Sequence, residues 1–168
     1  NPTIDSIEEA RAKYLSEGCD GIIAFGGGSS MDCAKAAGAR VAKPRQSVQK
    51  MGGVLKVLHR LPPLYAVPTT SGTGSEATFS AVVTDDAHRK YPISSLKLIP
   101  RAAALCPELT VGMSPRVTAN TGMDALCHAV EAYIGHCNTK QTKRDALAAI
   151  KLIFDYLPKA QQDGHDLL

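Results

Sequence analysis

A short apolar run followed by three consecutive glycines constrains this chain more than any other feature. The segment CDGIIAFGGGSSMDCAKAAGARVA contains a strand pattern over 21–25, the glycines Gly26–Gly28 and then a helical pattern. Another helical pattern precedes it and ends near Gly18. Helix, strand, glycine turn and helix in this order are typical of a parallel α/β sheet. The sequence therefore predicts that the first part of the chain is an α/β domain.

Further strand signals continue this domain. A buried strand is expected to end at Pro68, and the stretch 77–95 predicts a hairpin whose turn lies at DDAH. A further strand is expected from residue 101 until Pro107 stops it. We predict a domain boundary near Gly112, with α/β structure over 1–112.

The remainder, 113–168, is predicted to be all-helical. Ser114 can cap a helix whose first position is Pro115, and apolar residues then recur at helical spacing. A second helical pattern begins near residue 140, and Pro158 is expected to close it.

Charge and composition exclude several classes of partner. The net charge of +3 is small and the basic residues are scattered through 168 residues, so nucleic acid is not an expected partner. No apolar run reaches membrane-spanning length and the start lacks the pattern of a signal peptide. The five cysteines show no Cys-x-x-Cys spacing, which favours reduced thiols. A cytoplasmic protein with a small-molecule partner is expected.

The glycine turn is the first candidate binding site. Glycines between a strand and a helix let backbone N–H groups approach an anion at the positive end of the helix, and Ser29 adds a hydroxyl donor. The turn departs from the usual dinucleotide fingerprint, because Met31 stands where the third glycine would be. A tight turn without a ligand is the alternative interpretation.

The stretch VPTTSGTGSEAT is the second candidate. It places Thr69, Thr70 and Thr73 around two glycines where a strand ends. Ligands bind at the carboxyl ends of strands in open parallel sheets, so this loop and the glycine turn could hold one dinucleotide. A solvated turn is the alternative. No G-x-S-x-G sequence is present, so nothing supports a serine hydrolase.

Asp124 and His128 are the third candidate. They stand four residues apart in the helical stretch TGMDALCHAVEAY and therefore share one helix face, where a carboxylate and an imidazole could bind one metal ion. An ion pair, or a histidine satisfied by its neighbours, is the alternative interpretation. Two ligands alone do not complete a metal site.

Together, GGGSSMDCAK, PTTSGTGSEAT and TGMDALCHAVEAY resemble the iron-containing (group III) alcohol dehydrogenase family in order and spacing. The resemblance covers essentially the whole chain. It implies part of a Rossmann-like, parallel-sheet NAD(P)-binding domain over 1–112, followed by the first helices of a C-terminal helical metal-binding domain over 113–168. The positions that match the family's cofactor-binding residues are Gly27, Gly28, Ser29, Asp32, Thr69, Thr70, Thr73, Lys90 and Leu109.

The resemblance also implies a divalent metal, Fe2+ or in some relatives Zn2+, held by one aspartate and three histidines. Asp124 and His128 match the first two ligands and would act in catalysis through the metal. The other two histidines belong to helices beyond this sequence, and the family's first strands precede it. We therefore expect the 168 residues to be the middle of a longer enzyme, unable to turn over alone.

The implied reaction is reversible hydride transfer between an alcohol and NAD or NADP, with a small alcohol or aldehyde as substrate. Homodimers are common among such relatives. Two alternatives remain: a nucleotide-binding fragment without catalysis, and an enzyme resembling glycerol dehydrogenase or dehydroquinate synthase. The threonine-rich and DALCHAVEAY segments favour the alcohol dehydrogenase branch.

Overall fold

The computed structural model describes residues 1–136 and 138–165, which form two compact units. Unit 1 comprises Asn1–Pro68 and Gly74–Leu105, and unit 2 comprises Thr69–Thr73 together with the chain from Cys106 onward. Unit 1 thus ends before Gly112, where the sequence analysis places the boundary. The backbone around Gly112 belongs with the helices, because a side chain on Gly164 would lie 3.6 Å from the Val111 carbonyl and 3.8 Å from that of Met113.

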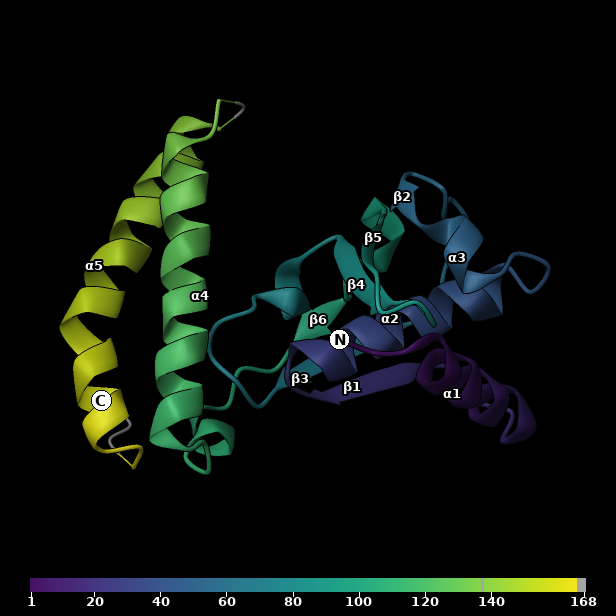
Figure 1. Cartoon of the computed structure of the whole chain (residues 1–168), viewed down its shortest axis with the longest axis horizontal. Coiled ribbons are helices and arrows are strands. Elements are labelled where there is room, and N and C mark those ends of the chain that lie inside the picture. The colour runs from purple at the N-terminus through teal and green to yellow at the C-terminus, as the bar shows by residue number, and fades with distance from the viewer. Residues whose placement is uncertain (137, 166–168) are drawn as a thin grey trace. The chain divides into compact units, whose positions relative to one another are not determined.

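A parallel three-stranded sheet forms one part of unit 1 (Figure 1). Its order is β1-β3-β6, where β1 is Ile22–Gly26, β3 is Leu64–Pro68 and β6 is Ala102–Ala103. This confirms the mixed α/β class with a parallel sheet, and β3 ends at Pro68 as predicted. The last strand is shorter than expected, since only two residues pair with β3.

Two helices accompany this sheet. Helix α2, Gly28–Ala42, packs against β1 and β3, and helix α1, Ile4–Ser16, packs against α2. Four of the buried residues in α2 are alanine or glycine, and such small side chains allow the helix to lie close to the elements around it. The predicted strand, glycine turn and helix are therefore confirmed.

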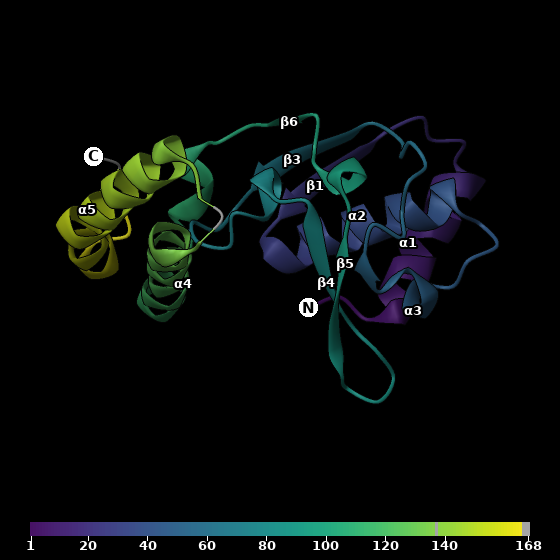
Figure 2. The ribbon, with the colours of Figure 1, turned by 90° about the horizontal axis from the view of Figure 1, so that it is seen from above.

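A second sheet in unit 1 contains the predicted hairpin (Figure 2). Strand β4, Ser80–Thr84, pairs antiparallel with β5, Lys90–Ser94, and the short β2, Gly53–Val54, pairs parallel with β5. The turn lies where DDAH predicts it, because the Asp85 carboxylate accepts from the backbone N–H groups of Ala87 and Arg89 at 3.0 and 2.8 Å. The short helical pieces are α3, Val48–Met51, with the 3-10 turns η1, Ser75–Ala77, and η2, Leu96–Leu98.

The core of unit 1 lies between α1, α2 and the second sheet. Helix α2 also packs against β4, so this one helix contacts strands of both sheets. The fully buried apolar residues of this cluster come from helices, strands and loops alike and include Ile7, Ala36, Ala39, Met51, Val57, Val83, Ile93 and Leu98.

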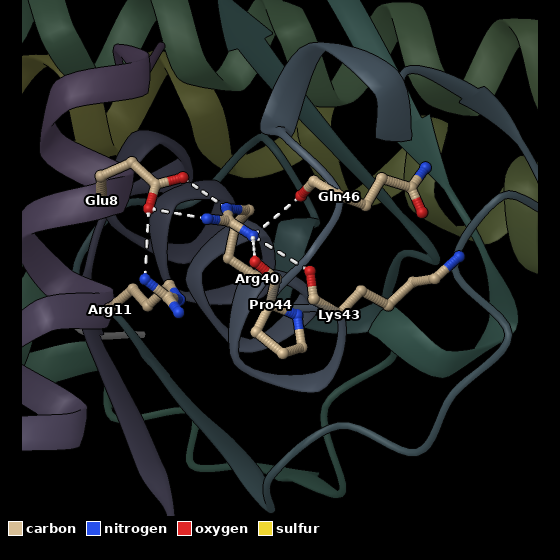
Figure 3. Close-up of polar contacts among 6 residues, drawn as sticks. All are labelled: Glu8, Arg11, Arg40, Lys43, Pro44 and Gln46. Carbon is tan, nitrogen blue, oxygen red and sulfur yellow. Dashed lines mark hydrogen bonds and ion pairs between the residues drawn. The ribbon is translucent and has the colours of Figure 1, made fainter.

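Arg40 connects α1, α2 and the loop that follows α2 (Figure 3). Its guanidinium binds both carboxylate oxygens of Glu8, and its Nη1 donates to the carbonyls of Lys43, Pro44 and Gln46 at 3.0, 3.3 and 2.8 Å. Arg11 is a weaker partner of Glu8, at 3.7 Å. Because Arg40 is only 8% exposed, these contacts satisfy a nearly buried charge.

Unit 2 is a pair of antiparallel helices preceded by the 3-10 turn η3, Pro107–Thr110 (Figure 1). Helix α4 is Pro115–Ile134 and helix α5 is Lys140–Gln162. Ser114 caps α4 as predicted, since its hydroxyl accepts from Val117 N at 3.3 Å. The helices touch where α4 has no side chain, because a Cβ on Gly122 would lie 2.3 Å from Leu157 Cδ1.

The predicted end of α5 at Pro158 is wrong. The helix continues to Gln162 with Pro158 inside it. Proline removes its own N–H bond, its ring crowds the carbonyl of Phe154 four residues earlier, and it disfavours the helical conformation of the residue before it, but the helix can continue beyond it. The turn beyond it is closed by Asp163 N, which donates to the Lys159 carbonyl at 2.8 Å. Both Pro158 and Phe154 are exposed, so water can bind the Phe154 carbonyl, which has no N–H partner at Pro158.

Cys19, Cys33, Cys106 and Cys127 are free thiols, as the spacing predicts, while Cys137 lies outside the described residues. Over residues 1–136 and 138–165, the helices are too short or too polar to cross a membrane.

Candidate functional site

The glycine turn lies between β1 and α2 in unit 1. Gly26 has φ +141°, and a side chain there would meet Ser30 Oγ at 2.5 Å, so both the backbone conformation and the space require glycine. Gly27 is the N-cap of α2, and Gly28 is its first residue. In the described part of the chain no side chain caps this helix start, which leaves its first N–H groups open to a ligand. Ser29 is exposed in the same turn.

The strand pairing fixes where the two candidate loops begin. Gly26 is the register partner of Pro68, the last residue of β3. The glycine turn starts directly after Gly26, and the threonine segment starts with Thr69 directly after Pro68. Both segments therefore leave from adjacent carboxyl ends of parallel strands, which is where open α/β sheets bind ligands.

Asp32, assigned to the cofactor by resemblance, lies in the second turn of α2 and has both carboxylate oxygens engaged within unit 1. Oδ1 accepts from Ser75 Oγ at 2.8 Å, and Oδ2 accepts from Val82 N at 3.0 Å. The carboxylate therefore connects α2 both to Ser75 and to strand β4.

Lys35 is a feature that the sequence analysis misses. Its side chain is fully buried, and Nζ donates to the carbonyls of Ser75, Thr78 and Ser80 at 2.6, 3.0 and 2.9 Å. Burial lowers the pKa of this ammonium to about 8, against the opposing effect of the Asp32 and Glu76 carboxylates. The available signal was a single lysine within the otherwise small and apolar run CAKAAGA.

The threonine segment Thr69–Thr73 belongs to unit 2, where it lies against α4. A side chain on Gly72 would be 2.2 Å from the carbonyl oxygen of Thr121, so this glycine is required by close approach of two backbones. Thr69, Thr70 and Thr73 are all partly buried. Ser71 and Gly72 line a cavity of about 660 Å³ together with Thr110, Thr118 and Tyr156.

The remaining predicted cofactor contacts are divided between the units. Lys90 is exposed at the start of β5 in unit 1, and Leu109 is partly buried in η3 of unit 2, next to the cavity-lining Thr110. The structure thus brings Gly27, Gly28, Ser29 and Asp32 together at the start of α2. It describes Thr69, Thr70, Thr73 and Leu109 within the other unit.

Asp124 and His128 lie one turn apart on α4 in unit 2. Asp124 Oδ1 is 3.9 Å from His128 Nε2, and the two side chains are 46% and 53% exposed. Metal–ligand distances of about 2.0–2.2 Å place two donors of one ion about 3–4 Å apart. The geometry and the mixed oxygen and nitrogen donors therefore fit Fe2+ or Zn2+. Among residues 1–136 and 138–165, no third histidine, cysteine or carboxylate completes a ligand group.

Two family models cover nearly all of the chain. Residues 1–107 match the model described as iron-containing alcohol dehydrogenase, and residues 118–168 match that described as Fe-containing alcohol dehydrogenase family, C-terminal. The gap between the two matches contains the predicted boundary at Gly112.

Individual relatives agree with this assignment. The chain is 42% identical over 168 residues to the NAD-dependent methanol dehydrogenase of Bacillus methanolicus, covering 99% of this chain and 44% of that protein. Among solved structures, alcohol dehydrogenase from Oenococcus oeni matches with a TM-score of 0.95 and 39% identity, over 99% of this chain and 44% of that one.

Sulfoacetaldehyde reductase from Bifidobacterium kashiwanohense, solved in complex with NAD+, matches with a TM-score of 0.89 and 34% identity, over the same shares. The chain thus spans less than half the length of each of these relatives. With both family models matched in the family's order, the chain belongs to the iron-containing alcohol dehydrogenase family.

Proposed function

We propose that this chain supplies the phosphate-binding turn and two metal ligands of an NAD(P)-linked, metal-dependent alcohol dehydrogenase. The enzyme would catalyse reversible hydride transfer between a small alcohol and its aldehyde or ketone. Membership of the family, and a relative named as an NAD-dependent methanol dehydrogenase, support this reaction class.

The observation that carries the proposal is the start of α2. Glycines occupy the last position of β1, the N-cap and the first helical position, and no described side chain caps the helix. The backbone N–H groups of Gly28 and Ser29 can therefore bind the pyrophosphate of NAD or NADP, where the helix dipole favours negative charge. By the resemblance, Thr69, Thr70, Thr73, Lys90 and Leu109 provide further cofactor contacts. Asp32 would act beside them, although its oxygens already hold Ser75 and Val82.

Asp124 and His128 would hold Fe2+, and Zn2+ suits the same two donors. When bound, the metal supplies Lewis acidity toward an alcohol hydroxyl, and the nicotinamide supplies the hydride acceptor. The Asp124 carboxylate would compensate part of the charge of the metal, and an imidazole nitrogen of His128 would supply the second donor. Since two ligands are too few, we expect residues 1–168 to show no turnover by themselves.

The test uses the protein at the full length its gene encodes, with NAD and NADP titrated by calorimetry into wild type and Gly27→Val. Gly27 has φ −81° and ψ −172°, an extended conformation that valine adopts, so the variant needs no strained backbone and should lose cofactor affinity through obstruction of the helix start. Thermal melting of the variant checks that it is folded. Gly112→Val is the matched control, because a side chain there meets nothing within 4 Å. Equal affinity in all three proteins, or no binding by wild type, would show the proposal to be wrong.

A further inference from the structure

The Lys35 ammonium lies within hydrogen-bond distance of five oxygens, all from one short segment. Besides the carbonyls of Ser75, Thr78 and Ser80, it contacts Ser75 Oγ at 3.2 Å and Thr78 Oγ1 at 2.9 Å. An ammonium has three N–H donors, so the three carbonyls alone can accept all of them. A fully buried charge with this many partners holds the backbone of 75–80 at fixed points.

Asp32 completes this arrangement from one turn earlier on α2. Its carboxylate carries the charge opposite to that of Lys35, and it accepts from Ser75 Oγ and from Val82 N. Ser75 is therefore bound by both side chains. Together, Asp32 and Lys35 hold the chain at both ends of the stretch from Ser75 to Val82.

We propose that Lys35 is a positioning residue for the cofactor, whose ammonium fixes the backbone segment 75–80 relative to the phosphate-binding start of α2. This inference rests on the proposed function. Lys35 and the glycine turn belong to the same helix, Gly28–Ala42, so the spacing between them is rigid. The segment 75–80 directly follows the threonine residues along the chain, and the 3-10 turn Ser75–Ala77 begins from the left-handed Gly74 at φ +60°. Loss of the ammonium would remove the hydrogen bonds that hold residues 75–80, which directly follow the threonine segment.

Arg40 provides a matched comparison on the same helix. It is also a nearly buried cation, and it also donates to three backbone carbonyls, but these belong to residues 43–46. Lys35→Met and Arg40→Met therefore each remove one buried cation from α2. Only the first removes contacts to the segment beyond the threonines.

The experiment measures NAD and NADP affinity, steady-state kinetics and thermal stability in the full-length wild type and both variants. We expect both methionine variants to melt at lower temperature. Lys35→Met alone should raise the Kd and the KM for the cofactor by about tenfold or more while kcat is retained, because a carbonyl-holding charge and its hydrogen bonds are lost. A purely structural role would lower both melting temperatures and leave both Kd values equal to that of wild type.

A milder variant covers the case in which Lys35→Met does not fold. Ser75→Ala removes the hydroxyl that links Lys35 to Asp32 and keeps the carbonyl at the same position. We expect a rise in Kd of about two- to tenfold for this variant. Wild-type Kd in whichever of the two variants folds, or an equal rise in Arg40→Met, would overturn the positioning role while leaving the proposed function intact. Wild type that binds neither cofactor would overturn both.

Discussion

Gly26 and Pro68 are opposite one another in the parallel pairing of β1 and β3. Each is the last residue of its strand, and each is followed at once by one of the two glycine-containing segments that are predicted to bind the cofactor. The strand register therefore determines that both segments start at one edge of the sheet. Substitutions at this edge should separate effects on the backbone from effects on binding.

Gly26→Ala is expected to destabilise unit 1 by more than Gly18→Ala. Both glycines have positive φ, +141° and +63°, but a side chain on Gly18 meets nothing within 4 Å whereas one on Gly26 meets Ser30 Oγ at 2.5 Å. Alanine in the left-handed conformation of Gly18 should cost about 1–2 kcal/mol, whereas φ +141° at Gly26 lies outside the left-handed helical region and should strain alanine at least as much before Ser30 is displaced. Urea denaturation of the two variants measures the difference. Equal losses would contradict the additional cost expected at Gly26.

Asp124→Ala in the full-length protein is expected to abolish stoichiometric iron or zinc binding while NAD(P) affinity stays within about twofold of wild type. One of the two donors on α4 is lost, and the glycine turn belongs to the other unit. Elemental analysis and calorimetry provide the two measurements. Glu131→Ala, which removes an exposed carboxylate from the same helix, is the control and should keep its metal. Full metal content in Asp124→Ala would contradict the assignment of this ligand.

Arg40→Met is expected to lower the free energy of unfolding by about 1–3 kcal/mol, because three carbonyls and the Glu8 carboxylate lose their shared donor. This expected loss of unfolding free energy is smaller than the loss from breaking a fully buried ion pair, because the Glu8 side chain is 36% exposed. Arg11→Met serves as the comparison, and the more open 3.7 Å contact there should be worth less than about 1 kcal/mol. Chemical denaturation measures the free energy of unfolding of both variants. A larger loss in Arg11→Met than in Arg40→Met would contradict this prediction.

Lys35 should make unfolding depend on pH in the alkaline range. The pKa of Lys35 is lowered by burial from 10.5 to about 8, so between these values the unfolded chain holds a proton that the folded chain has released. Stability from this group therefore rises as pH increases from 8 to 10.5, by up to about 1.4 kcal/mol per pH unit. The same contribution to stability is lost as pH falls from 10.5 to 8, and below 8 both the folded and the unfolded chain hold the proton, so this group adds no further slope. The Lys35→Met variant should show a flatter profile of unfolding free energy against pH, and identical slopes in the two proteins would refute the shifted pKa.

The features predictable from the sequence were those set by local chemistry. Three glycines after an apolar run, the DDAH turn, and Ser114 before Pro115 each specify a backbone conformation within a few residues, and the structure contains all three. The family resemblance rested on three short segments, GGGSSMDCAK, PTTSGTGSEAT and TGMDALCHAVEAY, and it is confirmed by the family models.

What the sequence could not provide depends on contacts between distant segments. In the sequence Lys35 looks like an ordinary helix residue. Its burial depends on the chain at Ser75, forty positions later, which binds its ammonium. Gly72 reads as a loop residue, but it is required by the backbone of Thr121. The helix end predicted at Pro158 is wrong because hydrogen bonds on both sides of the proline keep the chain helical.

The two buried cations of α2 also determine where the chain can tolerate change. Lys35 and Arg40 each hold their segment through three main-chain carbonyls, and every amino acid has such a carbonyl. The side chains of 43–46 and several of those in 75–80 can therefore vary among related proteins without loss of the anchor, whereas the lysine and the arginine cannot. A deletion in either segment should not be tolerated, because removing one residue moves a carbonyl away from its cation and breaks a hydrogen bond.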